Sequence, residues 1–235
     1  MKEKVKKYEF TGKTKQVTYG GRSVTLRRIR ALKDIPIHGV KKGDLGGWIE
    51  YRRNLSDEGS AWVGGEAWVF DKAKVSGEAL VRDIAQVFNE ARVYGAALVA
   101  GSAWVFDKAR IFGKARVHGC AQMHDSSSVF DEAQVCDSAQ VFNDACIHGK
   151  SKVLGCAQVF DKAWVSGEAQ VAGRAQVFGR AWVTGKARVF DEAQVTDAAQ
   201  VFGDAEIGGA TKVSGNMLMR DGSKVDEPVR SLQCR

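Results

Sequence analysis

Residues 102–113 read Ser-Ala-Trp-Val-Phe-Asp-Lys-Ala-Arg-Ile-Phe-Gly, which is one six-residue pattern written twice. The same pattern runs without an insertion from Ser60 to Asp221, where it gives 27 consecutive hexads. Its second position is Ala in 23 hexads, its fourth is Val in 22, and its sixth is always Gly, Asp or Asn. This repeat covers about two-thirds of the 235 residues, so its geometry determines the architecture of the protein.

The spacing within a hexad predicts a strand and a corner. Ala and Val stand two residues apart, so both point to the same side of a strand and face inward. Gly, Asp and Asn tolerate the left-handed backbone region, so the sixth position can turn the chain. A helix is excluded because a six-residue repeat does not stay on one face at 3.6 residues per turn. One coil cannot bury its own apolar side, so the pattern predicts an all-β solenoid of stacked coils.

A longer period of 18 residues gives the number of sides. Phe recurs at the fifth position of every third hexad, with His124 in one gap, and Gln recurs at the third position of those hexads. We therefore expect a three-sided parallel β-helix of about nine 18-residue coils. Outward ladders of Phe and Gln would form a long apolar strip, which is typical of an interaction face. The predicted face consists of Phe70, Phe88, Phe106, Phe142, Phe160, Phe178, Gln86, Gln122, Gln140, Gln158, Gln176 and Gln194.

The hexads resemble those of the hexapeptide-repeat proteins, and this resemblance implies a left-handed winding that the spacing alone does not show. Residues 40–50, Val-Lys-Lys-Gly-Asp-Leu-Gly-Gly-Trp-Ile-Glu, are similar to the N-terminal head of uncharacterised phage and prophage members. Several members of the wider family are acyltransferases, in which a histidine base lies near an inter-subunit groove and a loop often interrupts the coils. This chain departs from that pattern, because no loop interrupts its hexads.

Residues 1–53 carry ten more Lys and Arg than Asp and Glu, whereas the rest of the chain is mildly acidic. A hairpin with its turn at Gly20-Gly21 is predicted in this small β head, and the head should cap the open end of the β-helix. Its charge also suits phosphate groups of nucleotides or nucleic acid, with Arg27, Arg28, Arg30, Lys41 and Lys42 as the candidate residues. The predicted domains are a basic β-hairpin head (1–53), the hexapeptide-repeat β-helix (54–221) and a C-terminal cap and tail (222–235).

The composition predicts a cytoplasmic protein. No stretch approaches 18 consecutive apolar residues, and the charged N-terminus has no apolar segment behind it, so neither a membrane span nor a signal peptide is expected. The five cysteines are an odd number without CxxC spacing, which suits small residues in a reducing compartment.

No catalytic residue, metal or cofactor is predicted. The histidines are His38 in the head and His118, His124 and His148 at outward positions of the hexads. A general base needs a positioned partner and a sheltered cleft, and the sequence indicates neither. Their spacing is a poor match to the three-histidine zinc sites of some hexapeptide-repeat hydratases. The Asp and Asn residues at the corners are explained by turn chemistry.

Three functions stay open at this point. The favoured one is a non-enzymatic structural or protein-interaction module that forms a homo-oligomer (dimer or trimer) and is a candidate phage-encoded protein acting on a host component. The second is an acyl-CoA-dependent acyltransferase of the hexapeptide type. The third is a binder of phosphate ligands or nucleic acid that uses the basic head. No membrane partner is expected.

Overall fold

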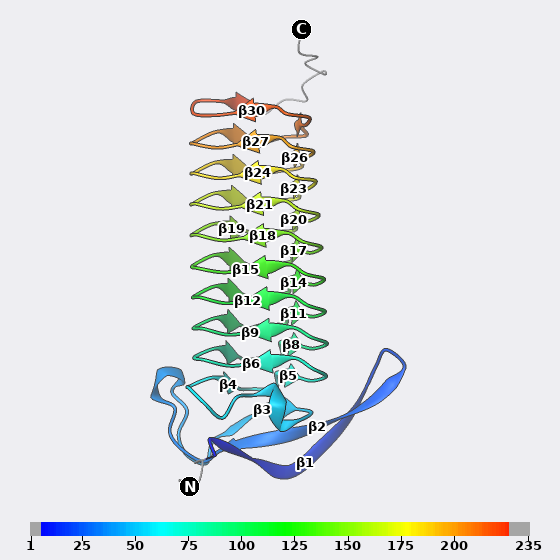
Figure 1. The fold of residues 1–235 in the computed structure, drawn as a ribbon, viewed down its shortest axis with the longest axis vertical. Helices are drawn as coiled ribbons and strands as arrows, with labels where there is room; N and C mark the ends of the chain where they lie inside the picture. Colours follow the sequence, from blue (N-terminus) through cyan, green and yellow to red (C-terminus); the bar gives the residue numbers. More distant parts are fainter. Residues whose placement is uncertain (1–5, 226–235) are drawn as a thin grey trace.

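The protein is a three-sided parallel β-helix with a β-hairpin head at its N-terminal end, as seen in a computed structural model that describes residues 6–225 (Figure 1). The third and fourth positions of each hexad form a two-residue strand, and strands 18 residues apart pair in parallel, for example Gln140 with Gln158. The all-β fold and the three strands per coil are thereby confirmed. The left-handed winding stays a prediction.

The first of the three sheets, called face A below, carries the predicted Phe and Gln ladders. After β3 (Leu45–Ile49) it consists of β5 (Trp68–Val69), β8 (Gln86–Val87), β11 (Trp104–Val105), β14 (Gln122–Met123), β17 (Gln140–Val141), β20 (Gln158–Val159), β23 (Gln176–Val177), β26 (Gln194–Val195) and β29 (Lys212–Val213).

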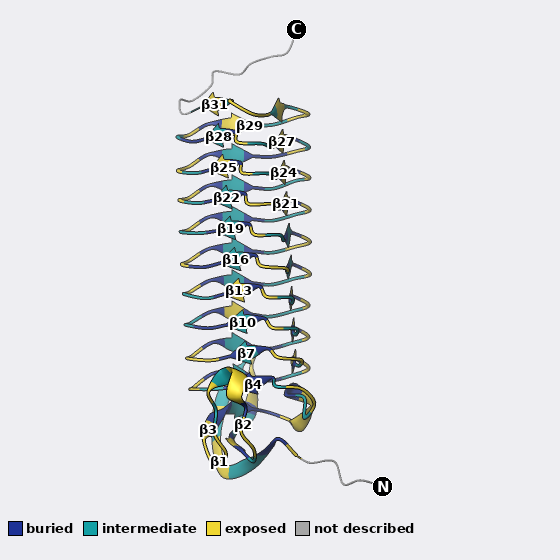
Figure 2. Ribbon diagram, turned by 90° about the vertical axis from the view of Figure 1, so that its left-hand side faces the viewer, coloured by how far each residue is buried: buried dark blue, intermediate teal, exposed yellow. Residues whose placement is uncertain are grey.

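The second sheet is called face B. Its strands are β4 (Trp62–Val63), β7 (Leu80–Val81), β10 (Leu98–Val99), β13 (Arg116–Val117), β16 (Gln134–Val135), β19 (Lys152–Val153), β22 (Gln170–Val171), β25 (Arg188–Val189), β28 (Glu206–Ile207) and β31 (Lys224–Val225). Most outward side chains of this face are half-buried, which gives its strands their teal colour in Figure 2.

The third sheet is called face C. Its strands are β6 (Lys74–Val75), β9 (Arg92–Val93), β12 (Arg110–Ile111), β15 (Ser128–Val129), β18 (Cys146–Ile147), β21 (Trp164–Val165), β24 (Trp182–Val183), β27 (Gln200–Val201) and β30 (Leu218–Met219). An isolated bridge between Leu55 and Val75 places one more residue at the head end of this sheet.

The interior of the prism is filled by the second and fourth positions of the hexads. Ala139 and Val141 are typical, because neither exposes any surface. Where a hydroxyl replaces Ala, the core accommodates it by a backbone hydrogen bond: Ser127 Oγ donates to the carbonyl of His124 at 2.8 Å, and Ser151 Oγ to that of His148 at 2.7 Å. Buried polar groups with such partners cost little stability. The burial of the second and fourth positions confirms the inward assignment of the repeat.

Each corner from Gly65 to Gly215 has a positive φ at its sixth position. The Asp corners add a contact that the sequence did not predict. Their carboxylates accept a hydrogen bond from the backbone N–H of the corner one coil further on, as Asp83 Oδ2 does from Gly101 and Asp197 Oδ2 from Gly215, both at 2.9 Å. Turn chemistry therefore explains these residues, and the same carboxylates tie successive coils together.

The head is a hairpin laid across the end of the prism (Figure 1). Strands β1 (Tyr8–Tyr19) and β2 (Arg22–Ala31) pair antiparallel across the glycine turn, which confirms the predicted hairpin. Strand β2 then pairs antiparallel with β3, and β3 pairs in parallel with β5. Two single-turn 3-10 helices complete the head, η1 (Pro36–His38) and η2 (Arg52–Asn54).

The head closes the apolar end of the prism. Tyr8, Ile29, Ile35 and Leu55 belong to the same buried cluster as the first coils. The approach is close at Gly47, where an added Cβ would lie 2.6 Å from the carbonyl oxygen of Ala67. Only glycine fits a backbone contact of this kind, which explains the glycine at this position of β3.

The stacked coils extend beyond the predicted range of 54–221 at both ends. Trp48 already pairs with Trp68 on face A, and β31 continues face B as far as Val225. Residues 226–235 of the predicted tail lie outside the described residues. Between residues 6 and 225, no helix is long and apolar enough to cross a membrane.

Candidate functional site

The rings of the predicted interaction face form one continuous stack along face A. Neighbouring rings lie one coil apart, with centroids 4.8 Å apart between Phe142 and Phe160 and 5.0 Å apart between Phe88 and Phe106. His124 fills the gap in the column, at 4.9 Å from Phe106 and 5.0 Å from Phe142. Each ring covers the faces of its neighbours, so much of the apolar area is used within the chain.

The expectation that this whole column is exposed is wrong for its first two members. Phe70 and Phe88 are each only 1% exposed. The hairpin folds over them, and the ring of Tyr19 meets Phe70 at 5.5 Å and Phe88 at 4.6 Å between centroids. The other predicted Phe residues are half-buried. The repeat alone gave no sign that the hairpin covers these two rings, because the hairpin is not part of the repeating sequence.

The Gln residues of face A also bind one another. The amide of Gln158 donates to Gln140 at 3.0 Å, that of Gln176 to Gln158 at 3.0 Å, and that of Gln194 to Gln176 at 3.1 Å. The amides use much of their hydrogen-bonding capacity within the column, and the stacked rings bury much of their area against one another. Face A is therefore largely self-contained beyond the hairpin, apart from Trp104, which is 42% exposed.

The edge of the hairpin is clamped to face A by one lysine. Lys15 Nζ lies 4.4 Å from the ring centroid of Trp48 and 4.5 Å from that of Trp68. The Glu66 carboxylate closes the cage, at 3.6 Å from Lys15 Nζ, and accepts the indole N–H of Trp48 at 2.8 Å. Burial lowers the pKa of Lys15 below its usual value, whereas the hydrogen bond from Arg28 lowers the pKa of Glu66. This cage has a structural role, since the positive charges of Lys15 and Arg28 are paired with the Glu66 carboxylate of the same chain.

The arginines predicted to bind phosphate have partners within the chain. Arg27 donates to the carbonyl of Glu50 at 2.7 Å and lies over the ring of Phe10. Arg28 pairs with Glu66, and Arg30 donates to Glu9 at 2.6 Å. Arg27 and Arg28 are half-buried, and the charges of Arg28 and Arg30 are neutralised by Glu66 of the body and Glu9 of the head.

The two lysines of the predicted phosphate site lie apart from that strand, in the segment between β2 and β3. Both are exposed, and their backbone N–H groups donate to carboxylates, Lys41 to Asp44 and Lys42 to Asp34, each at 2.8 Å. The structure therefore gives no shared pocket to the five predicted residues.

The histidine that fills the ring stack belongs to one cluster with the geometry to hold a cation. His124, Asp107 and Asp125 place one ligand atom each within 4.8 Å of one another. These groups are already paired, because His124 Nδ1 contacts Asp125 Oδ2 at 2.9 Å and Asn89 donates to Asp107 at 2.7 Å. The four described cysteines are free thiols.

Face C differs from the other two faces in what it exposes. Its outward third positions are exposed in seven of nine strands, whereas the corresponding positions are exposed in two of nine on face A, from β5 to β29, and in two of nine on face B, from β4 to β28. Three large apolar side chains are among them: Trp164 is 42% exposed, Trp182 is 50% exposed and Leu218 is 51% exposed. Face C is therefore the surface with the most unused contact area in the described chain.

The composition of face C changes along the prism. Lys74, Arg92 and Arg110 follow one another on the first three strands, directly paired in register. Ser128 and Cys146 come next, and the outward third positions form a low stretch here, that is, one where the side chains project little because both are small. The paired indoles of Trp164 and Trp182 then lie 5.6 Å apart between ring centroids at 14°, and Gln200 and Leu218 complete the face.

Sequence reasoning missed face C because its third positions follow no simple period. The signal was present in residue size and type: two Trp one coil apart have no counterpart on face B. A scan against models of known protein families and a search of curated proteins each found no match. The fold defines the class of this protein, a three-sided parallel β-helix with a capping head.

Proposed function

We propose that this protein is a non-enzymatic structural or protein-interaction module that presents rigid flat faces to a protein partner and works as a homo-oligomer. The observation that carries this proposal is the exposure of Trp164, Trp182 and Leu218 on face C, beside two faces whose outward side chains are mostly half-buried. Exposed aromatic residues on a preformed surface are the usual anchors of protein interfaces, since their large area binds at little cost in side-chain entropy. If the protein is phage-encoded, a host protein is the alternative partner.

A photo-crosslinking amino acid placed on each face tests this proposal. With p-benzoylphenylalanine at Trp182, we expect discrete protein adducts, which mass spectrometry assigns to the same chain or to another protein. The matched control carries the same residue at Gln140 on face A, where no adduct is expected. Equal labelling from both positions, or none from either, would contradict the assignment. Stabilisation of the purified protein by acetyl-CoA, seen as a raised melting temperature, would instead favour an acyltransferase.

A second candidate function is binding of phosphate groups on the basic strands of face C. Lys74 and Arg92 are exposed, lie directly opposite each other, and make no ion pair among residues 6–225. Like charges in register repel, and a bound anion removes that repulsion. A hollow next to them is lined by Arg53, Lys72, Lys74, Arg92 and one acidic residue, Glu90.

Salt-dependent binding of a fluorescent single-stranded oligonucleotide tests the second candidate. The variant Lys74→Glu with Arg92→Glu should lose most of the binding, because each phosphate contact depends on a fixed positive charge. The control Arg116→Glu with Arg188→Glu changes the same charge on face B and should retain it. Equal losses in the two variants would mean that the effect is one of net charge, and the site would be rejected.

A further inference from the structure

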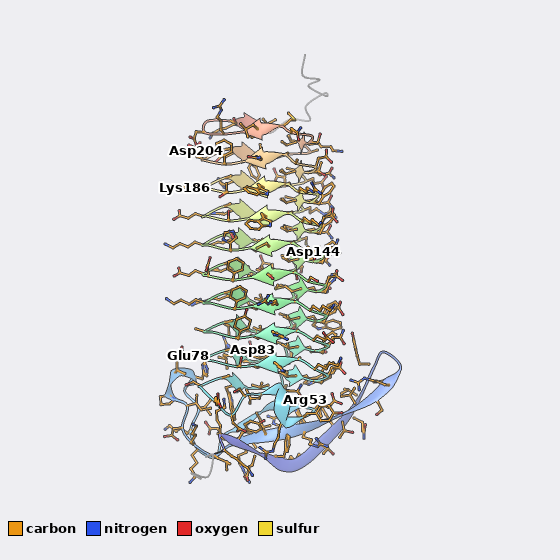
Figure 3. The ribbon with its side chains drawn as sticks, viewed as in Figure 1. Arg53, Glu78, Asp83, Asp144, Lys186 and Asp204 are labelled. Carbon is orange, nitrogen blue, oxygen red and sulfur yellow. The ribbon has the colours of Figure 1, made fainter. Side chains whose placement is uncertain are left out.

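One corner of face C carries an alternating row of charges. It is the corner between faces C and B. Over residues 114–204, after Ala96 and before Gly222, its first hexad positions, one per coil, are Lys114, Glu132, Lys150, Glu168, Lys186 and Asp204. All six side chains are exposed. Figure 3 labels Lys186 and Asp204 at this corner, where the side chains extend away from the prism. Among the described residues, none of the six takes part in an ion pair, so their charges are available to a partner.

The row has an even number of members, so it is complementary to a reversed copy of itself. We propose that face C packs against face C of a second copy, antiparallel, around a twofold axis that passes between the coils of Lys150 and Glu168. Lys150 then faces the partner's Glu168, Glu132 faces the partner's Lys186, and Lys114 faces the partner's Asp204. The symmetry gives each contact twice. This inference rests on the proposed function, since it names the partner of the interaction module.

The residues of face C itself fit the same axis, although they were not used to place it. The twofold passes between the strands of Cys146 and Trp164, so Trp164 faces the partner's Cys146 and Trp182 faces the partner's Ser128. Large side chains thus meet small ones, as close packing between two surfaces requires. Within one chain the low stretch at Ser128 and Cys146 lies directly before the two indoles.

The opposite corner of face C agrees as well. Asp144 and Lys162 are exposed first-position residues one coil apart at the corner between faces A and C, where Figure 3 labels Asp144. They flank the same axis, so Asp144 faces the partner's Lys162. Three independent columns of side chains therefore agree on one axis.

Other arrangements of the two copies place like charges opposite each other. A shift by one coil places Lys150 opposite the partner's Lys150 and Glu132 opposite the partner's Glu168, which are like charges. A parallel dimer sets the corner between faces A and C against the partner's corner between faces C and B, and it places Trp164 opposite the partner's Trp164. It pairs Asp144 with the partner's Lys150 and Lys162 with the partner's Glu168. However, it also brings Lys108 near the partner's Lys114 and Arg180 near the partner's Lys186, which are like charges. Like charges at an interface cost several kcal/mol and select against wrong partners, so the antiparallel register is the favoured one.

Charge reversal in both directions tests the pairing. By light scattering over a dilution series, the native protein should be a dimer, and Lys150→Glu or Glu168→Lys alone should raise the dissociation constant by about tenfold or more, because each places like charges together at two symmetric points. The double variant with both changes restores opposite charges across the axis and should restore the dimer. Both single variants keep the fold, because these side chains are exposed; circular dichroism checks this. Arg116→Glu on face B is the control and should not change the dissociation constant.

A disulfide across the axis gives the register directly. In a Cys146→Ser background, Ser128→Cys together with Trp182→Cys should form an intermolecular disulfide between Cys at 128 and Cys at 182 of two chains. Within one chain these positions are three coils apart, about 14 Å at strand spacing, which is beyond disulfide reach. A parallel dimer would instead link Ser128→Cys to itself in the single variant, and that result would overturn the antiparallel register.

The two proposals fail in different ways. A native protein that stays a monomer throughout the dilution series, a trimer, or a dimer insensitive to both single reversals would overturn the antiparallel dimer. Adducts of the face C crosslinker with a foreign protein would still support an interaction module in that case.

Discussion

The body and the head of this protein are stabilised in different ways. In the body, most buried Val and Ala residues lie in register with an equivalent residue one coil away, so the contacts of the core recur along the prism. In the head, each stabilising contact occurs once: Lys15 between two indoles, the Tyr8 hydroxyl on the carbonyl of Leu55, and Gly47 against Ala67. A repeated contact can be recognised from the period of the sequence, whereas a single contact needs the structure.

The largest effect is expected where a charge enters the repeated core. Val141 has no exposed surface and lies between Met123 and Val159 in register. Val141→Asp places an unpaired carboxylate in a narrow apolar interior, which should cost about 4 kcal/mol or more and unfold several coils. Thermal melting by circular dichroism measures this. Gln140→Asp on the same strand points outward and should cost less than about 1 kcal/mol; equal losses would contradict the inward assignment.

The next largest effect is expected at the junction of head and body. Gly47→Ala would place its Cβ 2.6 Å from the Ala67 carbonyl oxygen and 2.7 Å from a Val63 methyl group. Such overpacking against backbone should cost about 3 kcal/mol and loosen the head, which hydrogen exchange of β1 and β2 reports. Gly64→Ala is the matched control, because its nearest neighbour lies at 3.5 Å. If the two variants exchange alike, the close approach does not hold the head.

The period explains how much of the fold was predictable. Position two, position four and the corner residue of each hexad have one environment in every coil, so their spacing predicted the strands, the core and the three sides. The capping hairpin followed from its glycine turn. These features depend on neighbours that lie 1, 2, 6 or 18 residues away along the chain, which is information that the sequence displays.

The features that the sequence did not predict depend on contacts between residues that the 6- and 18-residue periods do not connect. Phe70 and Phe88 were expected on the surface but lie under Tyr19, which is more than 50 residues earlier in the chain. Arg28 was expected to be free for phosphate but pairs with Glu66. In the first case the head supplies the partner and in the second the body does, and no spacing rule connects the two segments. The exposed face C was also missed, since exposure depends on what the other segments leave uncovered.

The third prediction concerns a buried lysine in the head. Lys7 has no exposed surface, and its amino group has no hydrogen-bond partner among the described residues. Burial, with a smaller effect from Lys33, lowers the pKa of Lys7 from 10.5 to about 8, although the Asp57 carboxylate opposes the change. The folded head therefore binds fewer protons than the unfolded chain between pH 8 and pH 10.5, so its stability should rise with pH across that window and be constant below it.

Hydrogen exchange of β1, corrected for the intrinsic rate at each pH, measures this dependence. Lys7→Met should remove most of the rise between pH 8 and pH 10.5, the remainder coming from Lys15, whose pKa burial also lowers. It should stabilise the head at pH 7 by about 2 kcal/mol, because no unsatisfied donor remains. Lys6→Met is the control, since Lys6 is exposed, and it should leave the pH dependence unchanged. A flat profile in the native protein would mean that the amino group reaches water.

The smallest effect is expected at the lysine cage, where head and face A meet. Lys15→Met keeps the length and apolar stem of the side chain but removes the cation that lies between Trp48 and Trp68. Each cation–π contact contributes about 0.5–1 kcal/mol at such half-exposed sites, and part is regained because Met packs well against aromatic rings. The net loss should be about 1 kcal/mol, measured by exchange in β1. Lys13→Met, on an exposed position of the same strand, should cost almost nothing. If both changes cost the same, the single contact at Lys15 adds nothing to the head. The hairpin is then held by its other contacts, such as those of Tyr19 with Phe70 and Phe88 and of Arg22 with Asp71.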